Sequence, residues 1–575
     1  MDRALDDEWE FVPARLTPAG RRRRFLHGSL ADLSARSTLP SGPASLTELF
    51  NYPVSLVEKL CSTGYAASQC KRLLADGIVQ HSDYSGIGAE REVKRLLLQV
   101  LREEHALEIP HMFTKSCDID VHCQEVLKHA SHILDKGSSC VFADIMHQLV
   151  PEAQNWCAQM IADMPERNLE EQCKINKEIL EFLMQNMWVV DKDSLLTSVS
   201  DCECFCHGML LFGFGQEHKA HCLVHGQDCI VHKSRASLPN PRALVVADAG
   251  NCCQAWSSEG KRARGSHASQ VPLAAWLCMR KHLAVAGEED LFFQECTPLF
   301  DVDTHLRQPL KDSHRIIKVI AGPRLLGWPC SRDRLLSAGL NLHSLVWLGP
   351  KTDEEIQAEF EGMFGRCPHL NGSVFLQEDD SVHQAFLRDQ LGSRGHYPDI
   401  MPEGQKLFNK LLVPGQQQRL AAYQQRAAER AALDGTCFCD LEHWPDSPGP
   451  AFGPMMPCLL THGNILELSR SRFVLPAERF LSLGFHAMNH VSSRFFWPLA
   501  STVLRQPDRV TKRQSGNSQS LPIVLAWNLY VFGSTVQRER CEPLVSWLSN
   551  SSASDNEDAE AEAGTEASEE SSESN

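Results

Sequence analysis

The sequence lacks the long apolar segments that mark membrane and secreted proteins. No stretch approaches the roughly eighteen uncharged apolar residues of a membrane-spanning helix. The first residues, MDRALDDEWEFVP, contain no apolar core of a signal peptide. We therefore expect an intracellular protein without a membrane partner, located in the nucleus or otherwise in the cytoplasm.

An excess of positive charge is also missing. The formal net charge is −17, and Ser551–Asn575 contains nine acidic residues and neither Lys nor Arg, so the remaining chain carries −8. A uniformly basic nucleic-acid binder is excluded, whereas a local basic face is not. The Ser/Glu/Asp-rich end after residue 550 has low complexity and is predicted to be disordered.

The chain has the size and composition of a globular protein with several domains. Its 575 residues allow two or three domains, and 43% are hydrophobic. It also contains 22 cysteines. In a reducing compartment, cysteines serve as thiols, metal ligands or nucleophiles more often than as disulfides.

The stretch Leu244–Gly260, LVVADAGNCCQAWSSEG, places two cysteines directly after a short apolar run. Such a run, followed by Asp-Ala-Gly, predicts a buried parallel strand that ends in a sharp turn. Ligands of open α/β sheets bind beyond the carboxyl ends of the strands. Cys252 and Cys253 are therefore candidate nucleophiles, and the alternative is a pair of small core residues.

A glycine loop and two acidic strand ends precede this stretch. Gly86 and Gly88, in HSDYSGIGAEREV, permit a ligand to approach the start of a predicted helix. About thirty residues later Asp118 lies just before another predicted helix, where an acid can bind nucleoside hydroxyls. The apolar run VFADI then ends near Asp144. Three such strand ends in series predict a nucleoside-containing cofactor.

Soft metal ligands are concentrated in the second half of the segment from residue 151 to residue 240, after a part that is predicted to be helical. Ten lie within thirty-one residues: Cys202, Cys204, Cys206, His207, His218, His221, Cys222, His225, Cys229 and His232. Structural zinc prefers thiolate and imidazole ligands. The candidates for zinc ligands are Cys202, Cys204, Cys206, His207, His221, Cys222, His225 and Cys229. The alternative is a loop that happens to be rich in these residues.

The other segments have weaker patterns. Arg21–Arg24 lie in a flexible N-terminal arm, and residues 46–74 have helical spacing. LFFQECTPLF and RIIKVIAG are predicted strands. Residues 340–450 are mostly irregular and polar, apart from a helix predicted over Gln416–Leu433. Cys437, Cys439 and His443 are too few to close a metal site.

In order, these segments resemble the motifs of the DNA (cytosine-5)-methyltransferases over roughly residues 80 to 535. GNCCQAWSSEG resembles the GPPCQPFSxxG loop and places Cys253 at the nucleophile position. Tyr84 with SGIGA resembles the S-adenosylmethionine loop. Asp118 and Asp144 match the acids that hold the ribose and the adenine amino group.

The resemblance continues through the C-terminal half. Glu295 in QEC is similar to the Glu-Asn-Val motif, and GWPCSRDR, with Arg332 and Arg334, resembles GxPQxRxR. RFVLPAERFLSLGF resembles the RxLTPRExxRLxGF helix. QSGNS, which ends in Asn517 and Ser518, resembles the last cofactor motif. Eight motifs in the family's order carry the resemblance.

The resemblance implies an α/β protein with a Rossmann-like methyltransferase fold, that is, a mostly parallel sheet with helices on both faces, plus a smaller irregular target-recognition domain. Its expected parts are an arm with helices (1–75), a cofactor half (76–150), an insertion (151–240), a catalytic half (241–340), the target-recognition domain (341–458), returning motifs (459–540) and an acidic tail (541–575).

The implied activity is methyl transfer from S-adenosylmethionine to carbon 5 of cytosine in DNA, on a base flipped out of the duplex. The implied catalytic residues are Cys253, Glu295, Arg332 and Arg334. The implied cofactor-binding residues are Tyr84, Ser85, Gly86, Gly88, Asp118, Ile119, Asp144, Asn517 and Ser518. Cys253 would attack carbon 6, Glu295 would act as general acid, and either arginine would stabilise charge.

Several motif positions depart from the family. Cys252 replaces the proline before the nucleophile, Ala255 the next proline, Cys296 the Asn after the catalytic Glu, and Cys330 the Gln of GxPQ. Loss of the proline removes a fixed φ beside Cys253, and Cys252 is a second candidate nucleophile. Two alternatives follow: a methyltransferase-like protein that binds nucleic acid without turnover, and an enzyme that methylates RNA.

Overall fold

The computed structural model describes residues 39–538, except 163, 165–166, 186–217, 252, 254, 258–262, 396–402, 430–436 and 447–451. The chain divides into two units, Met1–Pro40 and Ser41–Asn575, and the second contains every element below. The predicted arm and acidic tail lie outside the described residues. None of the described helices is both long and apolar enough to cross a membrane.

A nine-stranded sheet in the order β5-β4-β3-β2-β1-β6-β7-β9-β8 organises the described chain. Its strands are β1 (Ile78–Asp83), β2 (His111–Cys117), β3 (Cys140–Phe142), β4 (Lys219–Cys222), β5 (Gln227–Ile230), β6 (Leu244–Gly250), β7 (Leu291–Cys296), β8 (His314–Ala321) and β9 (Arg334–Asn341). Strands β1, β2, β3, β6 and β7 pair in parallel, and β9 pairs antiparallel to both β7 and β8.

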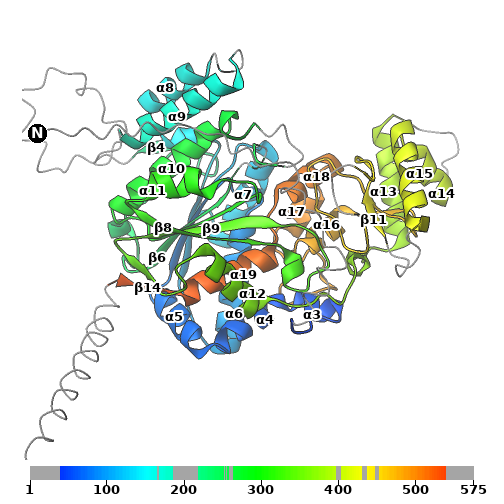
Figure 1. The fold of residues 1–575 in the computed structure, drawn as a ribbon, viewed down its shortest axis with the longest axis horizontal. Helices are drawn as coiled ribbons and strands as arrows, with labels where there is room; N and C mark the ends of the chain where they lie inside the picture. The colour runs from blue at the N-terminus through cyan, green and yellow to red at the C-terminus, as the bar shows by residue number, and fades with distance from the viewer. Residues whose placement is uncertain are drawn as a thin grey trace, which may run out of the picture. The chain divides into compact units, whose positions relative to one another are not determined.

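Helices cover both faces of this sheet, as Figure 1 shows. The face of β7 that bears Phe293 packs on Phe532 of α19 (Leu521–Gly533), and the opposite face bears Phe292 against Trp276 of α10 (Gln270–Val285). All six residues of β1 are buried. Strands covered on both faces are typically apolar, as in the run LVVA that begins β6. Strand β1 also buries four polar residues, Gln80, His81, Ser82 and Asp83, which have polar partners. The predicted mostly parallel sheet between helices is confirmed.

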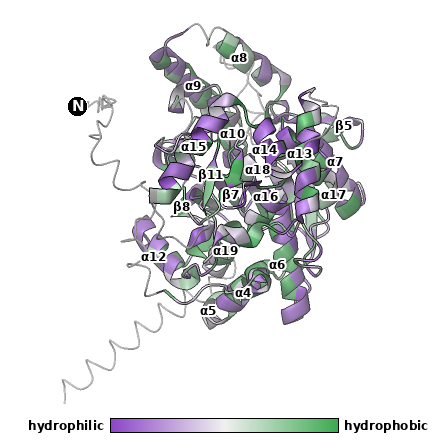
Figure 2. Cartoon of the chain, turned by 90° about the vertical axis from the view of Figure 1, so that its right-hand side faces the viewer, coloured by the Kyte–Doolittle hydropathy of each residue, from purple (hydrophilic) through white to green (hydrophobic). Residues whose placement is uncertain are grey.

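The remaining elements of the larger unit flank the sheet. The helices on its faces and ends are α3 (Leu46–Phe50), α4 (Tyr52–Cys61), α5 (Gly64–Leu74), α6 (Ala89–His105), α7 (Val121–Asp135), η1 (Ile145–Gln148), α8 (Pro151–Ala162), α9 (Leu169–Gln185), η4 (Arg235–Ser237), η5 (Arg264–Ser266), η6 (Asp303–Arg307), α11 (Gln308–Leu310) and η7 (Pro323–Leu325). Helices α8 and α9 carry hydrophilic and hydrophobic residues together (Figure 2), and their apolar residues form a cluster with α10.

A smaller set of elements forms a separate apolar cluster. It comprises α13 (Asp380–Ser393), α14 (Gly404–Leu411), α15 (Pro414–Glu429), β11 (Phe438–Asp440), β12 (Ile465–Glu467) and β13 (Arg472–Phe473). Leu391, Phe408 and Tyr423 bring the three helices together. The region predicted to be irregular therefore contains several helices, because widely spaced apolar residues still converge on one short sheet.

The last elements return the chain to the large sheet. They are β10 (Leu345–Trp347), α12 (Asp353–Phe364), η8 (Gly372–Phe375), α16 (Pro476–Ser482), α17 (Ala500–Leu504), α18 (Asp508–Asn517), α19 and β14 (Thr535–Gln537). Strand β10 pairs with β14, and α12 packs against β8. The start of the predicted target-recognition segment thus packs on the nine-stranded sheet, and the expected domain boundaries stay predictions.

Candidate functional site

A left-handed turn joins β1 to α6 and contains the predicted cofactor loop. Gly86 and Gly88 have φ values of 53° and 79°, and Tyr84 has a φ of 54°. Glycine adopts this conformation without the steric cost that other residues have, so both glycines are required by the backbone. The Ser85 hydroxyl accepts a hydrogen bond from the Cys117 N–H and ties the loop to β2.

Asp118, at the end of β2, lies against this loop. Its Oδ2 accepts a hydrogen bond of 2.7 Å from the Gly86 N–H, and its Oδ1 accepts one of 2.8 Å from the Asp120 N–H. Burial raises the pKa of Asp118, against the opposing effect of the two backbone donors. The next side chain, Ile119, is 75% exposed. The end of β2 thus presents a carboxylate and an exposed apolar group side by side.

The other predicted cofactor residues come from β3 and from the junction of α18 and α19. Asp144 follows β3 and caps η1, where its Oδ1 accepts a hydrogen bond from the Met146 N–H. Asn517 is exposed at the end of α18, whereas Ser518 is buried. A Cβ placed on Gly250 would lie 3.4 Å from both the Tyr84 carbonyl and the Gln519 amide. The glycine loop, the end of β6 and the α18–α19 junction are therefore adjacent.

Two buried amides near this junction have unused hydrogen-bonding capacity. Asn251 is 6% exposed and Gln519 is 7% exposed. Within the described residues, the Oδ1 and Nδ2 of Asn251 and the Oε1 of Gln519 have no hydrogen-bond partner. Buried polar groups in folded proteins are almost always paired. A polar ligand at this junction would supply the partners.

The predicted nucleophile, Cys253, is half-buried just beyond the end of β6. Its carbonyl accepts a hydrogen bond of 3.0 Å from the Trp256 N–H. Trp256 packs edge-on against Phe300 and His305, which holds the loop after β6 against the sheet. Cys252 and the side chains of residues 258–262 lie outside the described residues.

Glu295 and Arg334 form an ion pair of 2.7 Å at the same edge of the sheet. Glu295 is paired with Gly250 across β6 and β7, and Arg334 begins the neighbouring strand β9. Burial lowers the pKa of Arg334, but electrostatic interaction with Cys458, Glu295 and Cys253 raises it above its ordinary value. The guanidinium therefore lies within electrostatic reach of the Cys253 sulfur.

Arg332 has a different environment from Arg334. It is 2% exposed, and its guanidinium donates hydrogen bonds to the carbonyl oxygens of Leu459, Gly516 and Ser518. Burial lowers the pKa of Arg332. Its Nη1 also lies 3.8 Å from the Cys458 sulfur. Because its other contacts are with backbone carbonyls, Arg332 fixes the loop before α19 in place, and Arg334 is the arginine that pairs with Glu295.

The other thiols of the site differ in accessibility. Burial, together with the nearby Cys253 and Glu295, raises the pKa of Cys296 well above its ordinary value. Burial also raises the pKa of Cys330 to about 12. Burial thus favours the neutral thiol at Cys296 and at Cys330. Cys458, which the motifs did not single out, is half-buried with its Sγ 4.0 Å from Arg334.

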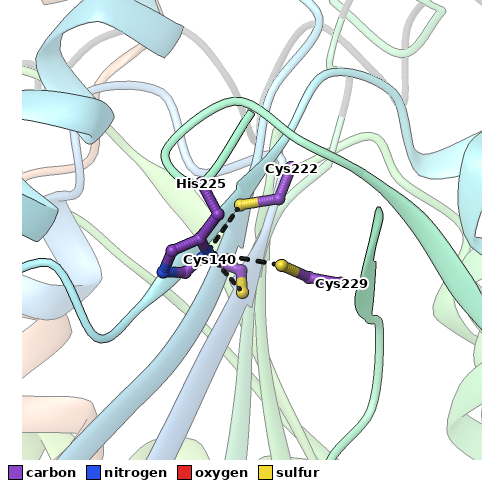
Figure 3. Close-up of side chains that lie close together, drawn as sticks. All are labelled: Cys140, Cys222, His225 and Cys229. Carbon is purple, nitrogen blue, oxygen red and sulfur yellow. Dashed lines mark hydrogen bonds between the residues drawn. The ribbon is translucent and has the colours of Figure 1, made fainter. Parts of the chain in front are cut away.

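The predicted metal ligands separate into three groups. Cys222, His225 and Cys229 lie together, and Cys140 of β3 joins them (Figure 3). His221 is directed elsewhere, with its Nδ1 3.9 Å from Asp228. Cys202, Cys204, Cys206 and His207 lie outside the described residues. Sequence reasoning missed Cys140 because it lies 82 positions before Cys222 and has no nearby ligand partner.

The strand order decides the fold. A parallel β3-β2-β1-β6-β7 run with helices on both faces is the doubly wound α/β arrangement, to which a reversed β9 is added between β7 and β8. The fold is the Rossmann-like α/β fold predicted from the sequence. The mostly parallel sheet places the ends of β1, β2, β3, β6 and β7 at one edge, where the predicted cofactor and catalytic residues lie.

Similarity of this chain to known proteins is found at the level of solved structures. No family model and no curated protein matches the chain. Similar solved structures include the Dnmt2 methyltransferase of S. pombe, at 12% identity over 81% of this chain and 99% of that one, with a TM-score of 0.35. The Entamoeba histolytica methyltransferase EhMeth is 13% identical over 79% and 98% of the two chains, with a TM-score of 0.35.

A DNMT2 mutant from Spodoptera frugiperda gives a similar result, with 12% identity over 79% of this chain and 99% of that one and a TM-score of 0.35. Values this low carry no argument about activity, which depends on the geometry of the site itself.

Proposed function

We propose that the protein transfers a methyl group from S-adenosylmethionine to carbon 5 of cytosine in DNA, through a covalent bond between Cys253 and carbon 6. The supporting observation is that Cys253 follows β6, whose Gly250 is paired with Glu295, and that Glu295 forms an ion pair with Arg334. These three residues lie at the ends of adjacent strands, next to the glycine loop between β1 and α6.

The residues at the sheet edge fit the proposed methyl donor. Asp118 and Asp144 offer carboxylates for ribose hydroxyls and an adenine amino group, and exposed Ile119 offers an apolar contact. The unsatisfied amides of Asn251 and Gln519 would bind polar atoms of the same molecule. When bound there, S-adenosylmethionine supplies an electrophilic methyl group.

Cys253 would overcome the low reactivity of the base. Carbon 5 of cytosine is a poor nucleophile, and attack of the thiolate on carbon 6 forms a sulfur–carbon bond that pushes an electron pair towards carbon 5. Carbon 5 would then form a bond to the methyl group, and the donor would leave as its thioether with the electron pair of the broken sulfur–methyl bond. Transfer of the carbon 5 proton to water and release of the thiolate would restore the aromatic ring, so Cys253 is regenerated.

Arg334 and Glu295 would support this attack. A nearby guanidinium favours the thiolate over the thiol, and Arg334 already lies within electrostatic reach of Cys253. Glu295 would hold the base at its N3 edge, where the negative charge develops. The ion pair with Arg334 fixes the orientation of that carboxyl group.

The cytosine must leave the duplex to reach a half-buried thiol, at a cost of a few kcal/mol. The elements α13–α15 and β11–β13 would recognise the target sequence. They join the catalytic part through Lys512, whose ammonium group donates a hydrogen bond to Asn464. Arg264 begins η5, shortly after the loop that carries Cys253, and is a candidate for contact with a DNA phosphate.

A trapping experiment tests the proposal. Duplex DNA that contains 5-fluorocytosine cannot lose fluorine from carbon 5, so the covalent intermediate accumulates in the presence of S-adenosylmethionine. We expect the wild-type protein to form a complex that survives denaturing electrophoresis, and Cys253→Ala to form none. Cys61→Ala, which removes an exposed thiol on α4, is the matched control and should retain the complex.

Other outcomes separate the alternatives. If the Cys252→Ala variant forms no covalent complex and the Cys253→Ala variant still forms one, Cys252 is the nucleophile. The substituted motif positions favour one alternative function, nucleic-acid binding without turnover; retention of DNA binding with no complex on DNA or RNA substrates supports it. A competition between duplex DNA and tRNA for labelled methyl groups determines which nucleic acid is the substrate.

A further inference from the structure

We propose that Cys140, Cys222, His225 and Cys229 bind one structural zinc ion that fastens the β4–β5 hairpin to the edge of the catalytic sheet. Their ligand atoms all lie within 4.8 Å of one another. Cys140 and Cys222 are buried, Cys229 is half-buried and His225 is exposed. The four residues come from β3, β4, the turn after it and β5, so the site joins three strands.

The distances fit tetrahedral coordination. The Nδ1 of His225 lies 3.3 Å from the Sγ of Cys222, 3.3 Å from that of Cys229 and 3.7 Å from that of Cys140. Zinc binds sulfur at about 2.3 Å and imidazole nitrogen at about 2.0–2.1 Å, and a tetrahedron with these bonds has sulfur–nitrogen edges of about 3.5 Å. Figure 3 shows the three sulfurs directed towards the one imidazole.

Hydrogen bonding alone does not account for this arrangement. The Nε2 of His225 lies 3.0 Å from the Gly137 carbonyl oxygen, a contact that requires the proton on Nε2. Nδ1 then has one lone pair, which cannot accept from three thiols at once. A zinc ion uses that lone pair and all three sulfurs. A backbone carbonyl bound to the second ring nitrogen is the usual support for a zinc-bound histidine.

The position of the site explains what the ion would do. Strand β4 is aligned with β3 through a single residue pair, Phe142 with Cys222. A two-stranded hairpin with so little support is marginally stable in water. Four protein ligands leave no open position for a substrate, which is typical of structural zinc. The ion would anchor Cys140, four residues before the predicted cofactor residue Asp144.

Metal analysis of the full chain tests the proposal. The protein is purified under reducing conditions without chelator, and zinc is measured by mass spectrometry. We expect Cys140→Ser and Cys229→Ser each to contain about one equivalent less zinc than the wild type. His221→Ala, in the same hairpin, and Cys61→Ser, an exposed thiol elsewhere, should match the wild type. Equal zinc content in the wild type and Cys140→Ser overturns the proposal.

A second measurement covers the case in which a serine variant fails to fold. Cys229→His keeps four ligands and should restore the lost equivalent. In wild-type protein reloaded with Co²⁺, thiolate-to-metal charge-transfer absorption is expected, and it should weaken in Cys229→His, which has one sulfur fewer. If the Cys204→Ser variant lacks the zinc ion and the Cys229→Ser variant retains it, the proposal is contradicted. None of these readouts depends on methyl transfer.

Discussion

Arg334 and Glu295 form a 2.7 Å ion pair at the edge where β7 and β9 meet, within electrostatic reach of the Cys253 sulfur. In this pair, Arg334 would favour the Cys253 thiolate, and Glu295 would hold the cytosine base. Both side chains are nearly buried, at 12% and 11% exposure. Little solvent therefore screens the charges of these two side chains.

Replacing Arg334 with alanine should lower the rate of methyl transfer strongly. The substitution removes the positive charge next to Cys253 and releases the Glu295 carboxyl group. We expect kcat/KM to fall about 100- to 1,000-fold, the range for loss of one preorganised electrostatic contact. Arg102→Ala, at an exposed pair on α6, is the control. Unchanged kcat/KM in Arg334→Ala would contradict the assignment.

Replacing Arg332 with methionine should act on stability and cofactor use. Its guanidinium donates to three backbone carbonyls, and leaving such buried acceptors unpaired costs about 1–3 kcal/mol. We expect the free energy of unfolding to fall by that amount and the KM for S-adenosylmethionine to rise more than kcat falls. A loss confined to kcat would instead indicate a direct catalytic role.

Replacing Asn251 with alanine tests the proposed cofactor position. The Asn251 amide is buried and has no hydrogen-bond partner among the described residues. If it binds the methyl donor, its loss should weaken cofactor binding about 3- to 10-fold, the value of one hydrogen bond. Isothermal titration with S-adenosylhomocysteine provides the measurement. Tighter or equal binding would show that this amide faces no ligand.

Glu90 predicts a pH dependence of stability. It is buried beside Ser82 and Asp248, and burial raises its pKa to about 8. An unfolded glutamate titrates near pH 4.3, so the folded state binds more protons between these values. The contribution of Glu90 to stability is therefore largest below about pH 4.3 and decreases as the pH rises towards 8.

Replacing Glu90 with glutamine should remove this contribution while keeping a hydrogen-bonding side chain near Ser82. We expect the variant to gain stability relative to the wild type at pH 8 and to gain little at pH 5, as measured by urea unfolding at both values. Glu108→Gln, at a position with no burial, should show no such difference. A gain that is equal at both pH values would rule out titration of Glu90.

The strands and turns around the glycine loop and the cysteine stretch are local features, and the sequence predicts them because strand and turn patterns extend over few residues. The structure brings Gly86 and Asp118 together at the ends of β1 and β2, and their role as cofactor-binding residues stays a prediction. The helices between residues 380 and 429 were not all predicted. Their apolar residues are widely spaced, so their packing depends on contacts with β11–β13.

The sequence by itself determined the order of the motifs, the apolar strands and the residue types at each strand end. The tertiary structure alone decided which residues meet. It pairs Arg334 with Glu295, whereas Arg332 donates hydrogen bonds to backbone carbonyls. It also brings Cys140 to Cys222, His225 and Cys229. The reason is physical: local periodicity reports which face of an element is buried, whereas strand order sets the neighbours of residues that are far apart in the chain.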